Sequence, residues 1–172
     1  MPTMDKACAT GHLLVRYGVM GEVARFAADG ELPSAGTPVV VETARGPQIG
    51  TVIAESKPAG EETVSRLVLR TATEEDLAEA ARLREVCEMA FAAWQERIRD
   101  WDVDVQLIDM EQTLEGGKQI LYVLNDRGPE TTKLALRAAA GGFGVIEVQP
   151  VGLEGVIEAS GGGGGCGNCG HR

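Results

Sequence analysis

Two cysteines near the end of the sequence have the spacing of a metal-binding pair. Cys166 and Cys169 form a C-x-x-C motif within a glycine-rich segment, and His171 follows two residues later. Two thiolates at this spacing can chelate one metal ion from a tight turn, and the neighbouring glycines let the backbone wrap around the ion. The motif therefore predicts a site for zinc or an iron–sulfur cluster.

A single C-x-x-C motif supplies only half of the usual ligand set, because tetrahedral zinc and four-iron clusters normally take four protein ligands. Cys8 and His12 are further candidate ligands, since the termini of a domain often lie close together. A partner protein or a second copy of the chain is the other source. The alternative to a metal site is a disordered tail whose thiols bind nothing.

Acidic residues form a second candidate site in the body of the chain. Asp109 and Glu111 lie two residues apart, with Glu115 across an expected hairpin, and could hold a divalent ion for hydrolysis. A solvated strand end is the alternative interpretation. Cys87 falls on the apolar stripe of an expected helix and is predicted to be a buried structural thiol. Because the common phosphate-loop, serine-hydrolase and zinc-protease motifs do not occur, we assign no catalytic residue.

Charge and hydropathy exclude further classes of protein. The 172 residues include 16 basic and 26 acidic side chains, giving a net charge of -10 that would repel a nucleic-acid backbone, so direct nucleic-acid binding is not favoured. No apolar run is long enough for membrane insertion, and no export signal is recognised, which predicts a cytoplasmic protein. Four basic residues, Arg66, Arg70, Lys133 and Arg137, form either a modest basic face for an acidic partner or a solvated surface.

The first part of the chain has the pattern of a small β unit. After a flexible N-terminus, residues 1–11, short apolar runs separated by turn residues predict strands at 13–17, 21–26, 38–43 and 48–53 within a unit spanning 12–56. The breaker-rich segment 57–60 is the expected boundary of this unit.

The second part combines helices and strands. A strand over 64–70, with Leu67 and Leu69 on one face, precedes a helix from an N-cap at Thr73 to Ile98. Strands follow at 103–110 and 119–124, then a helix that begins at Pro129 and a last strand at 145–148. This β-α-β-β-α-β order predicts a ferredoxin-like unit over 64–152, an α+β fold class, and a flexible Gly- and Cys-containing tail, 153–172.

Three sequence runs resemble the bacterial PSP C-terminal domain family. They are VVVETARG at 39–46 with its continuation 49–53, RTATEEDL at 70–77, and IDMEQT at 108–113. The resemblance implies a non-catalytic cytoplasmic adaptor that joins small helical regulatory proteins. A homo-oligomer is a further partner that the sequence leaves open. It also implies a cluster carried by cysteines and an influence on RNA processing by a ribonuclease, with effects on sporulation, competence and biofilm formation.

The resemblance transfers to the tail residue by residue. The strand that includes Ile146 and Glu147, followed by Cys166 and Gly167, matches the family's offset between its last strand and its first cysteine. Cys169 does not coincide with the family's later cysteine pair, and residues 126–140 also depart from the family pattern. We therefore predict a divergent member that acts as a regulatory adaptor with an iron–sulfur or zinc site. The alternative is an interaction module without a metal.

Overall fold

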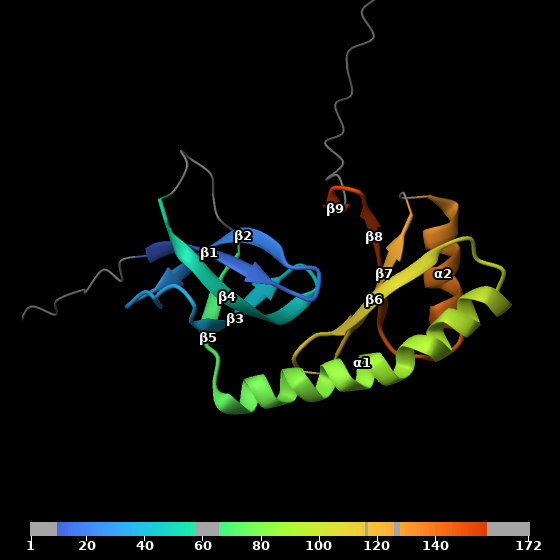
Figure 1. The fold of residues 1–172 in the computed structure, drawn as a ribbon, viewed down its shortest axis with the longest axis horizontal. Coiled ribbons are helices and arrows are strands. Elements are labelled where there is room, and N and C mark those ends of the chain that lie inside the picture. The colour runs from blue at the N-terminus through green and yellow to red at the C-terminus, as the bar shows by residue number, and fades with distance from the viewer. Residues whose placement is uncertain (1–9, 58–65, 116, 126–127, 158–172) are drawn as a thin grey trace, which may run out of the picture.

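The first five strands wrap around a common apolar interior. The computed structural model describes residues 10–57, 66–115, 117–125 and 128–157. The strands are β1 (Thr10–Tyr17), β2 (Glu22–Asp29), β3 (Pro38–Thr43), β4 (Gly46–Ser56) and β5 (Val68–Thr71), in the sheet order β2-β1-β4-β3-β5. The backbone N–H of Ala27 donates to the carbonyl of Arg66 at 2.8 Å and joins the two edge strands. The sheet is thus closed into a small barrel (Figure 1).

Alternate residues of the strands fill the inside of the barrel, as expected for strands with one face in a core. Tyr17 and Phe26 meet there edge to face, with ring centroids 5.4 Å apart. The buried residues of this cluster are Leu13, Val15, Tyr17, Phe26, Ala28, Val39, Val41 and Val52. The four predicted strands are therefore present, three of them extending beyond the expected bounds, and β5 joins them in the barrel.

The ferredoxin-like arrangement predicted for residues 64–152 is not what the strand pairing shows. Its expected first strand, β5, pairs with β3 of the barrel, from Val39 opposite Thr71 to Val41 opposite Val68. Val68 packs against the barrel interior, whereas Leu67 and Leu69 are about half exposed. The periodicity correctly predicted a strand, but not the sheet to which it belongs. The strand joins the barrel because Val68 packs in the barrel interior, whereas no second sheet covers Leu67 and Leu69. The α+β class is confirmed.

The second sheet contains four strands and is covered by two helices on one face (Figure 1). Its elements are β6 (Gln106–Gln112), β7 (Gln119–Leu124), β8 (Ile146–Gly152) and β9 (Gly155–Val156), with helices α1 (Glu74–Asp100) and α2 (Pro129–Ala140). β6 and β7 form an antiparallel pair, and α2 connects β7 to the parallel strand β8. Only the short strand β9 has no counterpart among the expected elements.

Strand β7 lies between two apolar clusters, because its side chains alternate between the faces of the sheet. Leu121 and Val123 pack beneath Trp94 and Leu134 of the two helices. On the opposite face, Ile120 and Tyr122 pack with Val19, Met20, Val151 and Val156. Since Val19 and Met20 belong to the turn between β1 and β2, the barrel itself covers this second face. Because residues 120–124 are all apolar, both faces of this strand can be buried in this way.

Helix α1 runs along both sheets (Figure 1). In its first half, Ala80 and Leu83 pack with Val40 on the outside of the barrel. In its second half, Trp94 and Ile98 are buried against the second sheet. The helix begins at the predicted N-cap, where the side chain of Thr73 accepts from Asp76 N and Asp76 accepts from Thr73 N. One 27-residue helix therefore fixes the spacing of the two units.

The N-cap of α1 predicts an acid-sensitive contribution to stability. Hydrogen bonds from Arg70 and from the Thr73 backbone hold the pKa of Asp76 well below its ordinary value of 3.8. This carboxylate therefore stabilises the folded state above the ordinary pKa, and the contribution is lost as the pH falls through about 4 and below. We expect the urea midpoint to fall less between about pH 6 and about pH 2.5 in Asp76→Asn than in the unmodified protein.

Glu75→Gln is the matched control, since it removes another carboxylate from the same helical turn. An equal loss of midpoint with acid in the unmodified protein and in Asp76→Asn would contradict this assignment.

Candidate functional site

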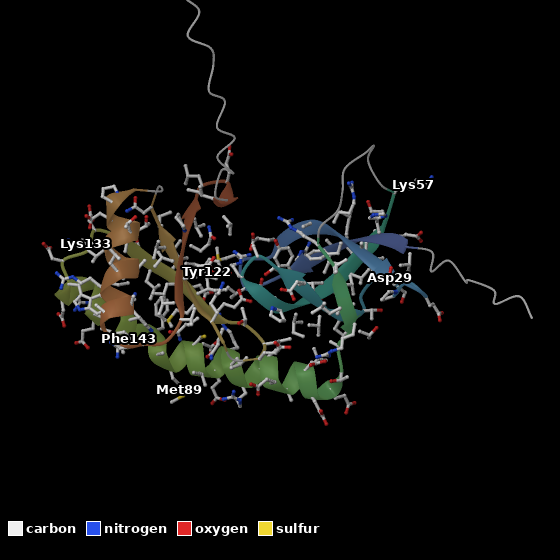
Figure 2. All side chains as sticks on the ribbon, turned by 180° about the vertical axis from the view of Figure 1, so that it is seen from behind. Asp29, Lys57, Met89, Tyr122, Lys133 and Phe143 are labelled. Atoms are coloured by element: carbon white, nitrogen blue, oxygen red, sulfur yellow. The ribbon has the colours of Figure 1, made fainter. Side chains whose placement is uncertain are left out.

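A single carboxylate joins the barrel to the second sheet. Glu111 on β6 accepts hydrogen bonds from three groups: the backbone N–H of Val19 at 3.2 Å, the side-chain amide of Gln48 at 2.8 Å and the hydroxyl of Tyr122 at 2.8 Å. Val19 and Gln48 belong to the barrel, whereas Tyr122 belongs to β7. Figure 2 shows Tyr122 where the second sheet meets the barrel. Separating the two units would leave this carboxylate without its barrel donors.

A buried ion pair lies next to this carboxylate. The guanidinium of Arg45 pairs with Glu22 and stands 5.7 Å from the ring centroid of Tyr122. Burial by itself would lower the pKa of Arg45, but attraction by the Tyr122 hydroxyl and by Glu22 outweighs burial, so the pKa is raised. Arg45 is 6% exposed and remains a cation. It therefore holds the turn after β1 and the turn after β3 against the same aromatic ring.

The phenol of Tyr122 is kept neutral by its surroundings. Burial raises its pKa, and the negative charge of Glu111 raises it further, because ionisation would place two anions side by side. Tyr122 is fully buried and donates its proton to Glu111 at 2.8 Å. The group acts as a hydrogen-bond donor that fixes the orientation of the carboxylate.

The tight turn between β3 and β4 positions the barrel side of this joint. Thr43 donates from its hydroxyl to the side-chain oxygen of Gln48 at 2.7 Å and accepts from the backbone N–H of Arg45 at 3.2 Å. Gly46 has a φ of 123°, and a Cβ there would approach Thr113 at 3.3 Å. Glycine is thus favoured both by the backbone conformation and by the closeness of Thr113, which directly follows β6.

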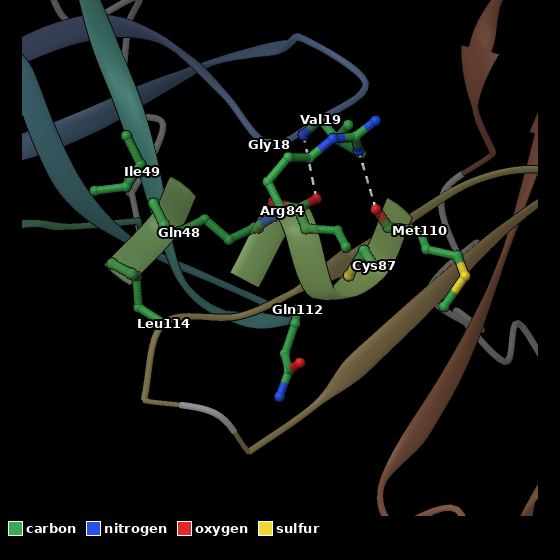
Figure 3. Close-up of a pocket in the computed structure, with 11 residues that line it drawn as sticks. Gly18, Val19, Gln48, Ile49, Arg84, Cys87, Met110, Gln112 and Leu114 are labelled. Atoms are coloured by element: carbon green, nitrogen blue, oxygen red, sulfur yellow. Dashed lines mark hydrogen bonds between the residues drawn. The ribbon is translucent and has the colours of Figure 1, made fainter. Parts of the chain in front are cut away.

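A cavity of about 260 Å³ opens beside Glu111, where the barrel, α1 and β6 meet. Figure 3 shows Cys87 and Arg84 on the helix, Ile49 on β4 and Val19 on the turn after β1 around this space. Arg84 donates to the Asp109 carboxylate at 2.8 Å and to the Met110 carbonyl at 3.3 Å. The lining residues are Gly18, Val19, Gln48, Ile49, Ala80, Arg84, Cys87, Met110, Glu111, Gln112 and Leu114.

Both acidic residues suggested for a divalent ion have protein partners. Asp109 accepts from Arg84 and from the Met110 backbone, and Glu111 accepts the three hydrogen bonds at the joint. Glu115 is exposed and has a positive φ of 58°. Within the described ranges, no group of three or more His, Cys, Asp or Glu side chains is placed to hold a metal ion. The structure therefore shows Asp109 holding α1 against β6, and Glu111 holding the barrel against the second sheet.

Most of the predicted terminal metal ligands lie outside the described residues, namely Cys8, Cys166, Cys169 and His171. The remaining one, His12, is a half-buried residue of β1 opposite Ala27 of β2 and Ser56 of β4. Cys87 is 2% exposed, which confirms the prediction of a buried thiol.

The four residues suggested for a basic face are divided between the two units. Arg66 and Arg70 lie beside and within β5 of the barrel, and Arg70 is paired with Asp76. Lys133 and Arg137 are on α2, at the far end of the molecule from the barrel (Figure 2). They do not form a single surface.

Sequence reasoning did not identify the residues of the joint on the barrel side. The local pattern indicates a turn at Arg45, a strand at Gln48 and an apolar strand at Tyr122, and none of these indicates a polar joint. A signal was present, because Arg45 falls in one family-like run and Glu111 falls in another. The sequence does not show that these two runs meet in the folded chain.

Comparison with known proteins identifies a family-like region. Residues 66–127 match the PSP1 C-terminal conserved region. The match confirms the family resemblance over this part of the chain.

A particular relative is similar over most of the chain. The match is to the stage 0 sporulation protein YaaT of Bacillus subtilis strain 168, with 28% identity over 156 residues. The alignment covers 89% of this chain and 57% of YaaT, so the chain spans a little over half the length of that relative. No solved structure matches the chain. Among the described residues, neither helix is both long and apolar enough to cross a membrane.

The joint predicts a marked effect of removing its buried cation. Arg45→Met leaves the Glu22 carboxylate without its partner, and we expect a loss of about 3 kcal/mol in the free energy of unfolding, measured with urea. Arg16→Met, at an exposed position of β1, should change this free energy by less than about 0.5 kcal/mol. Equal losses in the two variants would show that the buried pair does not stabilise the joint.

Proposed function

We propose that this protein is a cytoplasmic, non-catalytic regulator that works by binding other proteins, in a process related to sporulation and to RNA processing. The link to sporulation comes from the name of its relative YaaT. The observation that carries the proposal is the joint, since two of the three family-like sequence runs, 39–46 and 108–113, meet there. Thr43, Arg45, Gln48 and Glu111 act there as structural groups whose polar atoms are bonded to one another.

A joint of this kind suits an adaptor. The barrel and the second sheet are held by Glu111, by the ion pair of Arg45 with Glu22, and by the long helix α1. Such an arrangement presents surfaces of both units to partners at a constant separation, which lowers the entropic cost of binding a partner that contacts both. Small helical regulatory proteins and a ribonuclease are the partners that we propose.

We also propose that Cys166 and Cys169 contribute to an iron–sulfur or zinc site in the assembled complex. Two thiolates at this spacing supply half of a four-ligand set, and other ligands would come from Cys8, His12 or His171, or from a partner.

Anaerobic purification with metal analysis and a visible spectrum tests the metal site. We expect bound iron or zinc in the unmodified chain and a loss of most of this metal in Cys166→Ser, because one ligand is removed. Cys87→Ala is the matched control, since it removes a buried thiol that lies within the α1 helix, and it should retain the metal. An unmodified chain that is free of metal and colourless would overturn this part of the proposal.

The second candidate function is a purely structural interaction module without a metal, and it is favoured by the fact that the described contacts between the two units need no cofactor. Deleting residues 161–172 separates the two functions. If the tail forms part of the interaction, partner capture in an anaerobic pull-down should fall at least tenfold. Unchanged capture would favour the module.

A further inference from the structure

The cavity beside Glu111 has the size of a site for a short aliphatic chain. Its volume of about 260 Å³ would hold several water molecules, at about 30 Å³ each, and is slightly below the range of about 300–1,000 Å³ that is usual for drug-sized ligands. Val19, Ile49, Ala80 and Leu114 contribute apolar groups to its wall. A stem of four or five methylene groups would gain from leaving water here.

Among the described residues, the carboxylate of Glu111 has no cationic hydrogen-bond partner. The three donors to Glu111 are an amide N–H, a side-chain amide and a phenol, and all of them are neutral. The guanidinium that lines the cavity, on Arg84, is shared by Asp109 at 2.8 Å and Glu88 at 3.0 Å. A carboxylate offers about four acceptor positions, so Glu111 can accept one further hydrogen bond.

The thiol of Cys87 reports the resulting field inside the cavity. Its pKa is raised first by burial, and the charges acting on it are three carboxylates, Glu111, Asp109 and Glu88, against the single guanidinium of Arg84. Of these charges, the nearby Arg84 acts most strongly on the thiol. The geometry gives the net balance: one guanidinium, that of Arg84, pairs with both Asp109 and Glu88, and Glu111 adds a third carboxylate, so the charged groups around the cavity carry an excess of negative charge. A cationic group would be attracted, and an anion of the same size would be repelled.

We propose that this cavity binds an alkylammonium group, with its methylene stem against the apolar wall and its ammonium donating to Glu111. A lysine side chain combines an apolar stem with a charged head. The apolar wall of the cavity matches the stem, and the carboxylate of Glu111 matches the head. The group comes either from a lysine of another protein or from a free aliphatic amine. The first source rests on the proposed function, whereas the binding of a free amine does not depend on it.

Three probes of equal length separate charge from apolar contact. Pentylamine, 1-pentanol and pentanoate are each titrated into the isotopically labelled full chain at neutral pH, and the backbone amide signals of Val19, Ile49 and Cys87 are followed by NMR. We expect saturable shifts with pentylamine, at least tenfold weaker binding of 1-pentanol and no binding of pentanoate. Equal binding of pentylamine and 1-pentanol, or shifts that do not saturate, would overturn the proposal.

Two variants on the same helix test the location of the site. Ala80 lines the cavity, so Ala80→Leu should fill it and weaken pentylamine binding at least tenfold. Ala81→Leu places the same side chain on the exposed surface next to it and should leave binding within twofold. Unchanged binding to Ala80→Leu would show that the amine binds elsewhere.

Glu111→Gln tests the charge and should reduce the affinity for pentylamine to that for 1-pentanol. Because Glu111 also holds the joint, the comparison is made only if the amide spectrum of the variant stays dispersed as in the unmodified protein. If it does not, the decision rests on Ala80→Leu and on the three probes. Retention of the preference for pentylamine in a folded Glu111→Gln would overturn the role of this carboxylate.

N-acetyl-lysine N-methylamide distinguishes the two sources of the amine. Binding of this compound at the same signals as pentylamine supports a lysine presented by a protein. Binding of pentylamine alone supports a free amine. Both results are independent of the metal analysis. A failure of the proposed cysteine site would therefore not affect the test of the cavity.

Discussion

The carboxylate of Glu111 is the constraint on which the arrangement of the two units depends. A partly buried carboxylate needs hydrogen bonds that replace the hydration it loses, and here the barrel supplies two of the three donors and β7 supplies the third. Rotation of one unit against the other would break at least one of these bonds. The neighbouring pair of Arg45 and Glu22 extends the same constraint to a second turn of the barrel.

Apolar packing brings the hydrogen-bonding groups of the joint together in one relative orientation of the two units. The hydrogen bonds form only because β7 has apolar side chains on both faces, so that Tyr122 and Ile120 meet the turn between β1 and β2 while Leu121 faces the helices. Helix α1 adds a second, apolar connection along the opposite side of the joint. Apolar burial supplies most of the stabilisation, and the polar network determines which relative orientation of the units receives it.

The same geometry leaves a cavity at the meeting point of three elements. Strands and a helix that diverge from a common joint cannot fill all the space between them, and the gap beside Glu111 is lined by side chains from each. A protein that binds other proteins, as proposed for this chain, would gain from such a feature, since one inserted side chain would contact both units together. The cysteine pair of the tail would add a separate and chemically different contact.

The separation along the chain between two interacting residues decides whether the sequence alone could predict their contact. Turn residues, the N-cap at Thr73, the proline at the start of α2 and the apolar pattern of β7 act within a few residues, so the elements and the α+β class were predictable. The pairing of β5 with β3 and the donors of Glu111 were not, because they join residues up to 92 positions apart. A local pattern shows that a side chain is polar or apolar, but only the tertiary structure decides which distant group it meets.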